Sequence, residues 1–173
     1  MRVILLLTLT LLLGGCTGYS RVLEQTPPDK LLAAAKVYKV APVSFTWTPP
    51  ADWEVTGEEW EKERKTLSDA FRQEVKEESR KQVDILKLDD KPTEGVRVDC
   101  NVFAADRGGW GSSGTIAAEV TLTDIKSGRV LYKGKLEGNS RNAGMEGKDS
   151  WGRFRVGLQN IAREVAEIMD DAG

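Results

Sequence analysis

Three stretches of the chain alternate between apolar and polar residues, and they constrain the fold more than any other feature of the sequence. They cover residues 96–104, 115–123 and 130–137. Side chains two residues apart point to the same face of a strand, so each stretch predicts a strand with one buried face. The last two stretches flank the turn Asp124-Ile125-Lys126-Ser127-Gly128 and therefore predict a hairpin. Cys100 falls on the apolar side of its stretch, so we expect a buried, unreactive thiol.

Two other regions carry apolar residues at the spacing of a helix. The first begins at Thr56-Gly57-Glu58-Glu59, a capping box in which a threonine and a glutamate satisfy free N–H groups at a helix start. The second begins at Ser150, a residue suited to an N-cap, and runs almost to the end of the chain. Both therefore predict amphipathic helices with one apolar face. Their apolar stripes are formed by Trp60, Leu67, Phe71 and Val75 in the first helix, and by Phe154, Leu158, Ile161, Val165 and Ile168 in the second.

Shorter apolar runs at residues 37–45 and 83–88 predict two further strands. The elements then follow the order strand, helix, four strands, helix. This order predicts an α+β domain (an α/β sandwich) with a mixed, mostly antiparallel five-stranded sheet and both helices on one face. The first helix is expected to connect two parallel strands, and tight turns are expected to make the remaining pairs antiparallel.

The same topology predicts which loops share an end of the sheet. Trp47 and Trp53 are expected to lie at one end with the turn at residues 126–128. The N-terminal segment, the loop with Trp110 and the loop at residues 138–149 are expected at the other end, because each antiparallel strand reverses direction.

The beginning of the chain has the features of an export signal. Arg2 precedes an apolar core at residues 3–13, which is shorter than the roughly 20 residues of a membrane-spanning helix. The core ends in Leu13-Gly14-Gly15-Cys16, which resembles the bacterial lipobox, the motif in which the cysteine becomes the lipidated first residue of the mature chain. We therefore expect a signal peptide at residues 1–15, a lipidated N-terminus and tether at residues 16–36, and a single domain at residues 37–173.

Lipid on Cys16, a diacylglycerol group and an acyl chain such as palmitate, would attach the protein to a membrane that it does not span. Thr17 follows the cysteine. In Gram-negative bacteria the absence of Asp at this position implies the outer membrane. The expected location is the outer membrane, with the domain facing the periplasm.

The composition excludes several classes of function. The chain has no histidine, which excludes Ser-His-Asp and Cys-His catalysis and imidazole metal sites, and its net charge of -2 offers no case for nucleic acid. The run from Gly109 to Gly114 has the spacing of a dinucleotide-binding loop, but it leads into a predicted strand and not into a helix. Asp89 and Asp90 lack the spacing of a calcium loop. We therefore expect no cofactor, nucleotide or metal, and no enzymatic activity.

Several motifs together resemble a known type of domain. The lipobox, the strand end Pro42-Val43-Ser44-Phe45 and the run at residues 122–131 are similar to those of small periplasmic lipoproteins with the α/β domain of the TolB amino-terminal domain and the curli secretion lipoprotein. The resemblance extends from about residue 37 to the C-terminus. It implies a non-enzymatic binding module of a multi-protein envelope assembly. The chain is too short for the extra strands that build the curli pore.

We therefore expect an outer-membrane lipoprotein that binds a partner protein in envelope assembly, transport or maintenance. The alternatives are an accessory to envelope polysaccharide or lipid transport, an activator of peptidoglycan synthases, against which the short tether argues, and a hydrolase. Because tryptophan is enriched at interface hot spots, the candidate contacts are Trp47 and Trp53, with Trp110 as a membrane-surface or secondary contact and Arg107 beside it. The alternative role of Trp47 and Trp53 is to pack over the edge of the core, and the helical spacing of Trp60 and Trp151 predicts core positions. The oligomeric state is left open.

Overall fold

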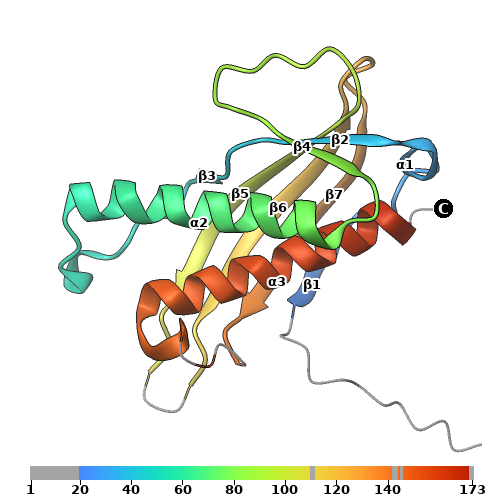
Figure 1. Cartoon of the computed structure of the whole chain (residues 1–173). Helices are drawn as coiled ribbons and strands as arrows, with labels where there is room; N and C mark the ends of the chain where they lie inside the picture. Colours follow the sequence, from blue (N-terminus) through green and yellow to red (C-terminus); the bar gives the residue numbers. More distant parts are fainter. Residues whose placement is uncertain (1–19, 110–111, 142–143, 145, 172–173) are drawn as a thin grey trace, which may run out of the picture.

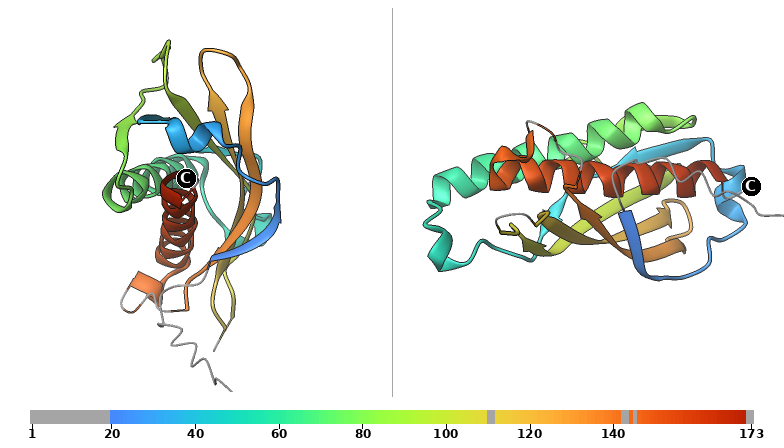
Figure 2. Two further views of the ribbon diagram at one scale, coloured as in Figure 1. Left: turned by 90° about the vertical axis from the view of Figure 1, so that its right-hand side faces the viewer. Right: turned by 90° about the horizontal axis from the view of Figure 1, so that it is seen from below.

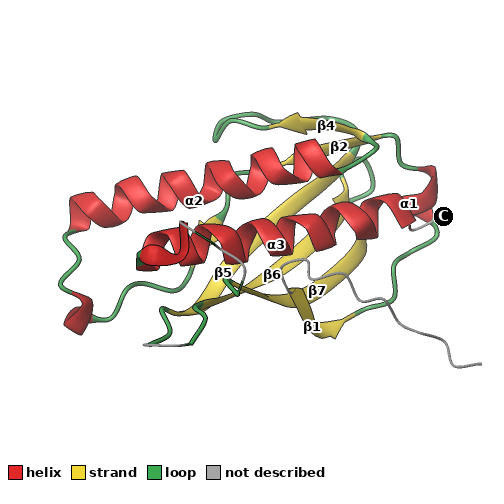
Figure 3. Ribbon diagram, turned by 60° about the horizontal axis from the view of Figure 1, so that its bottom comes forward, coloured by secondary structure: helices red, strands yellow, loops and turns green. Residues whose placement is uncertain are grey.

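The computed structural model describes residues 20–109, 112–141, 144 and 146–171, which form two layers, a twisted sheet and a pair of long helices (Figure 1). In chain order the strands are β1 (Ser20–Gln25), β2 (Val37–Val40), β3 (Ser44–Phe45), β4 (Gln82–Ile85), β5 (Val96–Asp106), β6 (Thr115–Asp124) and β7 (Val130–Asn139). The helices are α1 (Leu31–Ala34), η1 (Ala51–Trp53), α2 (Gly57–Glu78), η2 (Glu146–Lys148) and α3 (Ser150–Asp171). Helices α2 and α3 lie side by side on one face of the sheet (Figures 2 and 3). The predicted α+β class is confirmed.

The sheet of the described chain has seven strands in the spatial order β1-β7-β6-β5-β2-β4, and β3 also pairs with β5. Strands β1, β7, β6 and β5 are antiparallel neighbours. Strand β2 is parallel to both β4 and β5, and β3 is parallel to β5. The sheet is therefore mixed, with an antiparallel half and a parallel half.

The sequence predicted five strands, and the two additional ones have separate causes. The predicted strand at residues 37–45 is interrupted at Pro42, so that β2 and β3 pair with β5 as two separate strands. Between them, the Val43 N–H donates to the Ser68 hydroxyl of α2 at 3.0 Å and not to the sheet. Strand β1 lies in the segment predicted as a tether and pairs with β7 at the edge of the sheet. Its residues are mostly exposed, so it lacks the alternation that marks the other strands.

The direction of β5 corrects the predicted topology. The residues between β4 and β5 were expected to form a tight turn between antiparallel strands. They instead form a loop that returns the chain to the end of the sheet where β4 began, which makes β4 and β5 parallel strands on either side of β2. Leu88, predicted in the strand before this loop, is 85% exposed.

The alternating stretches point their apolar residues toward the helices, as predicted. Val98, Cys100 and Val102 of β5 are buried, while Arg97 and Phe103 are exposed on the open face. Burial raises the pKa of the Cys100 thiol far above its ordinary value, because the thiolate would lose its hydration. Cys100 is therefore the inert core residue that the alternation indicated.

Helix α3 approaches the sheet closely where two glycines meet. A Cβ atom on Gly138 of β7 would lie 1.9 Å from the carbonyl oxygen of Gly157 of α3, so no other residue fits there without moving the helix. Beside this contact, the buried Asn160 donates its amide N–H to the Asn139 carbonyl at 2.8 Å. These contacts fix the position of α3 over β7.

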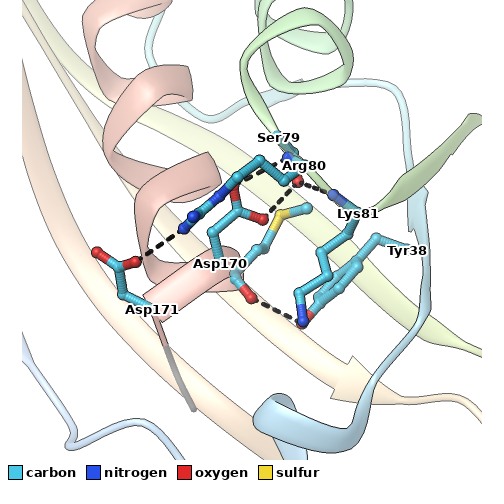
Figure 4. A network of polar contacts seen from close by, with 7 residues as sticks. Tyr38, Ser79, Arg80, Lys81, Asp170 and Asp171 are labelled. Atoms are coloured by element: carbon cyan, nitrogen blue, oxygen red, sulfur yellow. Dashed lines mark hydrogen bonds and ion pairs between the residues drawn. The ribbon is translucent and has the colours of Figure 1, made fainter.

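The C-terminal end of α3 is held by a network of polar contacts (Figure 4). The Asp170 carboxylate accepts the backbone N–H of Arg80 at 2.9 Å and the Ser79 hydroxyl at 3.1 Å, and both donors belong to the turn after α2. The Tyr38 hydroxyl donates to the carbonyls of Leu32 and Met169, and burial raises its pKa to about 12. Helices α2 and α3 therefore end against the same turn.

The starts of the two long helices differ slightly from expectation. Thr56 is the N-cap of α2, and its hydroxyl accepts the Glu59 N–H at 3.1 Å. The cap of α3 is Asp149 and not Ser150, since the Asp149 carboxylate accepts the Gly152 N–H at 2.7 Å. In the described part of the chain, none of the helices combines the length and apolar character needed to cross a membrane.

Candidate functional site

Six aromatic residues meet where β3 ends and where both long helices begin. Each ring has its centroid within 6.5 Å of that of at least one other member of the group. We call this group the aromatic cluster. Its members are Phe45, Trp47, Trp53, Trp60, Trp151 and Phe154.

The members come from two regions that are about ninety residues apart in the sequence, residues 45–60 and the start of α3. Phe45 ends β3, and Trp47 follows it with its backbone N–H bonded to the Val102 carbonyl of β5 at 3.2 Å. Trp53 lies in η1, the turn that leads into α2. The other three members lie in the first turns of α2 and α3, which begin at the same side of the molecule (Figure 3). The cluster therefore depends on the complete tertiary fold.

Phe154 is the buried centre of the cluster. Its side chain is fully buried, and its ring centroid lies 5.8, 5.7 and 5.8 Å from those of Trp47, Trp53 and Trp151. Trp60 closes the group, 5.6 Å from Trp47 and 5.8 Å from Trp151. The four tryptophans are half-buried, so each keeps part of its ring accessible; Trp47, Trp53 and Trp151 pack on the core, and Trp60 packs on other members of the cluster. Such rings combine a large apolar area with few rotatable bonds.

Polar groups surround the rings. The Arg107 guanidinium lies 5.1 Å from the centroid of the Trp53 ring, a cation–π contact. The Trp151 indole N–H donates to the Glu59 carboxylate at 3.1 Å. Glu59 therefore contributes twice here, because its backbone N–H also donates to the Thr56 cap of α2. Arg153 donates to the carbonyls of Gly147 and Arg107 at 2.8 and 2.9 Å, which ties the loops after β7 and β5 together.

The structure brings three predicted contacts together, namely Trp47, Trp53 and Arg107. Their predicted position was wrong. Because Phe45 lies opposite Val102, the chain leaves β3 at the end of the sheet where β5 finishes, and not at the end with the turn at residues 126–128. The error follows from the parallel direction of β5.

Two further tryptophans of the cluster were predicted as core residues of the helical stripes. Trp60 and Trp151 lie in the first turns of their helices, and their rings meet at the aromatic cluster, half exposed. Their position so close to the predicted helix starts was the signal that could have separated them from the stripes. Trp110 and Cys16 lie outside the described residues.

Outside the aromatic cluster, charged side chains line a hollow on the open face of the sheet. No group of three or more Cys, Asp or Glu side chains in the described chain is arranged to hold a metal ion. A shallow hollow on the open face is lined by Glu24, Glu119, Lys133 and Lys135 among others. These charges are paired across the strands, Lys135 with Glu24 at 2.8 Å and Lys133 with Glu119 at 3.0 Å. The charged side chains that line this hollow are therefore occupied by one another.

No protein-family model matches the chain, and no curated protein sequence matches it. Among solved structures it is similar to the PelC dodecamer from Paraburkholderia phytofirmans, with 12% identity, a TM-score of 0.47 and coverage of 90% of this chain and 97% of that chain. It is also similar to a hypothetical protein from Chlamydia trachomatis, with 13% identity, a TM-score of 0.45 and coverage of 77% and 95%. A protein from Xanthomonas campestris follows, with 15% identity, a TM-score of 0.39 and coverage of 76% and 81%. Likeness at this level assigns neither a family nor a function to this chain.

Proposed function

We propose that this chain is a lipid-anchored, non-enzymatic protein of the outer membrane whose domain binds a partner protein as an accessory to envelope assembly, transport or maintenance. The aromatic cluster is the observation that carries the proposal. Tryptophan and arginine dominate the hot spots of protein interfaces, and four tryptophans lie here beside Arg107. We place the partner contact on Trp47, Trp53 and Arg107.

The rigidity of the cluster supports a binding role. Trp47 is fixed through its backbone to β5, and Trp53 stacks on the buried Phe154 with an interplanar angle of 15°. Because these rings are already ordered, they would lose little side-chain entropy when a partner binds. A preformed, half-exposed aromatic surface suits a specific protein contact.

The absence of histidine from the sequence supports a non-enzymatic role, and so does the burial of Cys100. Burial holds the pKa of this thiol far above neutral pH, and a thiol in that state is a poor nucleophile. The remaining candidates for chemistry are carboxylates, hydroxyls and lysines, and on the open face Lys133 and Lys135 are paired with Glu119 and Glu24.

The partner contact can be tested by photo-crosslinking in cells. A photoreactive residue at the exposed position Thr48 should capture a partner, and Trp47→Ala with Trp53→Ala should abolish that capture in a domain that still folds by circular dichroism and thermal melting. Phe103→Ala, on the open face and 37% exposed, is the matched aromatic control and should leave the capture intact. Undiminished capture in the folded double variant would refute the assignment.

The anchor is tested separately. Cys16→Ala should move the protein from the membrane fraction to the soluble fraction, because two or more acyl chains are needed for a stable attachment. If the variant remains in the membrane fraction as firmly as the parent, the anchor lies elsewhere.

A further inference from the structure

The register of the sheet shows which end of the domain lies nearest to Cys16. Ser20, the first residue of β1, pairs with Gly138 of β7, Gly138 pairs with Ile116 of β6, and Ile116 pairs with Ala105 of β5. Ser20 therefore lies in the same row of the sheet as the end of β5 and the start of β6. We call this the loop end, since the loops after β5 and β7 leave the sheet there.

The link between Cys16 and this row is short. Three residues, 17–19, lie between Cys16 and Ser20, and the four Cα-to-Cα steps of this link reach at most about 14 Å when fully extended. Strand β6 has ten residues, which corresponds to a length of about 34 Å. A lipid on Cys16 would therefore keep the loop end beside the bilayer, while the turn after β6 could extend a full strand length away from it.

The loop end presents cationic side chains to its surroundings. Arg107, Arg141 and Lys148 are all exposed. Three acidic residues lie at the same end, namely Asp106, Glu146 and Asp149, and two of them bind backbone N–H groups: Asp106 accepts the Gly108 N–H at 2.8 Å, and Asp149 caps α3. Arginine and lysine bind phosphate oxygens through charge-assisted hydrogen bonds. The short link places this end beside the bilayer, and its cationic side chains suit the phosphate groups there.

We propose that the loop end rests on the phosphate groups of phospholipids through Arg141, Lys148 and Arg107, so that the aromatic cluster is presented beside the bilayer. This inference rests on the lipid anchor at Cys16 that forms part of the proposed function. It differs from the expectation from the sequence, which placed Trp47 and Trp53 at the end of the sheet opposite the lipid-bearing N-terminal segment. A partner that binds the cluster would then meet the domain at the membrane surface.

Energy transfer to labelled lipids tests the orientation. The full-length lipidated protein, with Cys100→Ala to remove the second thiol, would be reconstituted into vesicles of phosphatidylethanolamine and phosphatidylglycerol that contain acceptor-labelled headgroups. A donor on Ser113→Cys, at the loop end, should transfer several-fold more efficiently than a donor on Lys126→Cys, at the opposite turn; both positions are exposed. Equal transfer, or stronger transfer from Lys126→Cys, would overturn the orientation.

A longer link separates lipid binding from simple tethering. Inserting about twenty Gly and Ser residues between Thr17 and Ser20 adds a coil with a span of about 25 Å, which frees the domain to move away. If the loop end binds headgroups, Ser113→Cys should keep its advantage over Lys126→Cys. Loss of that advantage would show that the short link alone sets the orientation and would overturn the headgroup contact.

Charge reversal completes the test in the long-link protein. Arg141→Glu with Lys148→Glu should reduce transfer from Ser113→Cys several-fold, and the reduction should be smaller in vesicles made at high salt because screening weakens the contact. Lys87→Glu with Lys91→Glu, at the other end, is the control with the same change of charge and should have no effect. Equal effects of the two pairs would refute a specific role for the loop end. A protein that does not incorporate into vesicles at all would refute the anchor, a result distinct from these.

Discussion

The two ends of the helical layer are stabilised in different ways. Helices α2 and α3 end against a polar network, in which Asp170 accepts from Arg80 and Ser79. They begin at the aromatic cluster, where tryptophans pack on Phe154 and keep part of their rings exposed. The Asp170 side chain is only 7% exposed, so the polar end offers little to a partner.

This difference separates structural from functional residues. At the polar end each buried group is matched by a partner within the chain, so substitutions there are expected to change stability alone. At the aromatic end the buried ring supports stability and the half-exposed rings are available for binding. Substitution of the buried ring should therefore lower stability, whereas substitution of the half-exposed rings should lower partner binding.

The largest expected effect is that of Phe154→Ala. This ring is fully buried beneath three tryptophans, and removal of a buried aromatic ring costs about 3–5 kcal/mol of unfolding free energy. Urea denaturation measures the loss. Phe103→Ala, on the open face, should cost less than about 1 kcal/mol. Equal losses would contradict the view that the cluster has a buried centre.

The polar end should lose less when Asp170 is replaced. Asp170→Ala leaves the Arg80 N–H and the Ser79 hydroxyl without their acceptor and should cost about 1–3 kcal/mol, by the same measurement. The neighbouring Asp171 is 75% exposed and pairs with Arg80 at the surface, so Asp171→Ala should cost less than about 1 kcal/mol. If both variants lost the same stability, the buried hydrogen bonds would not be what holds this end.

Acidification should reduce the stability that the Asp170 carboxylate gives to the polar end. Burial alone would raise the pKa of Asp170, but the hydrogen bonds from Arg80 and Ser79 hold it below its ordinary value of 3.8. A carboxyl group with a lowered pKa in the folded state stabilises the protein above the unfolded pKa, and this stabilisation is lost as the pH falls through the folded pKa. The difference in unfolding free energy between wild type and Asp170→Asn should therefore be constant above about pH 5 and should shrink below the ordinary value. A difference that grows on acidification would contradict the hydrogen-bonded carboxylate.

The parts of this fold that the sequence predicted are those where burial imposes a period. Strand β5 alternates because one face contacts the helices and the other is open, and the Thr56 cap follows from a motif that is local in sequence. Strand β1 was not predicted, because it is an edge strand with nearly every residue exposed and so shows no alternation. Its position is set by its pairing with β7, which local sequence does not encode.

The sequence predicted three residues of the candidate site, Trp47, Trp53 and Arg107, but placed the two tryptophans at the wrong end of the sheet. Their contact with a partner stays a prediction. The direction of β5 depends on its pairing with β2, more than fifty residues earlier in the chain, and the turn-like residues between β4 and β5 fit a hairpin as well as a return loop. The direction of β5 decides at which end of the sheet Trp47 lies, because Trp47 follows β3, which pairs with β5. A helical stripe likewise cannot show where the sheet beneath it stops, so Trp60 and Trp151 were assigned to the core.

The smallest expected effect on stability is that of Arg107→Ala. This variant tests whether a residue at the aromatic end can contribute to partner binding without contributing much to stability. The guanidinium contributes one cation–π contact to Trp53, which is worth about 0.5–1 kcal/mol at an accessible site. The hydrogen bond from Arg153 goes to the backbone carbonyl of Arg107 and is retained in the variant. Stability should therefore fall by about 1 kcal/mol or less, whereas crosslinking from Thr48 should fall markedly, since an arginine within a tryptophan hot spot contributes strongly to affinity. Arg21→Ala, which removes a surface pair with Glu137, is the control and should change neither quantity measurably. A large loss of stability with unchanged crosslinking would make Arg107 a structural residue and would leave the tryptophans alone as the partner contact.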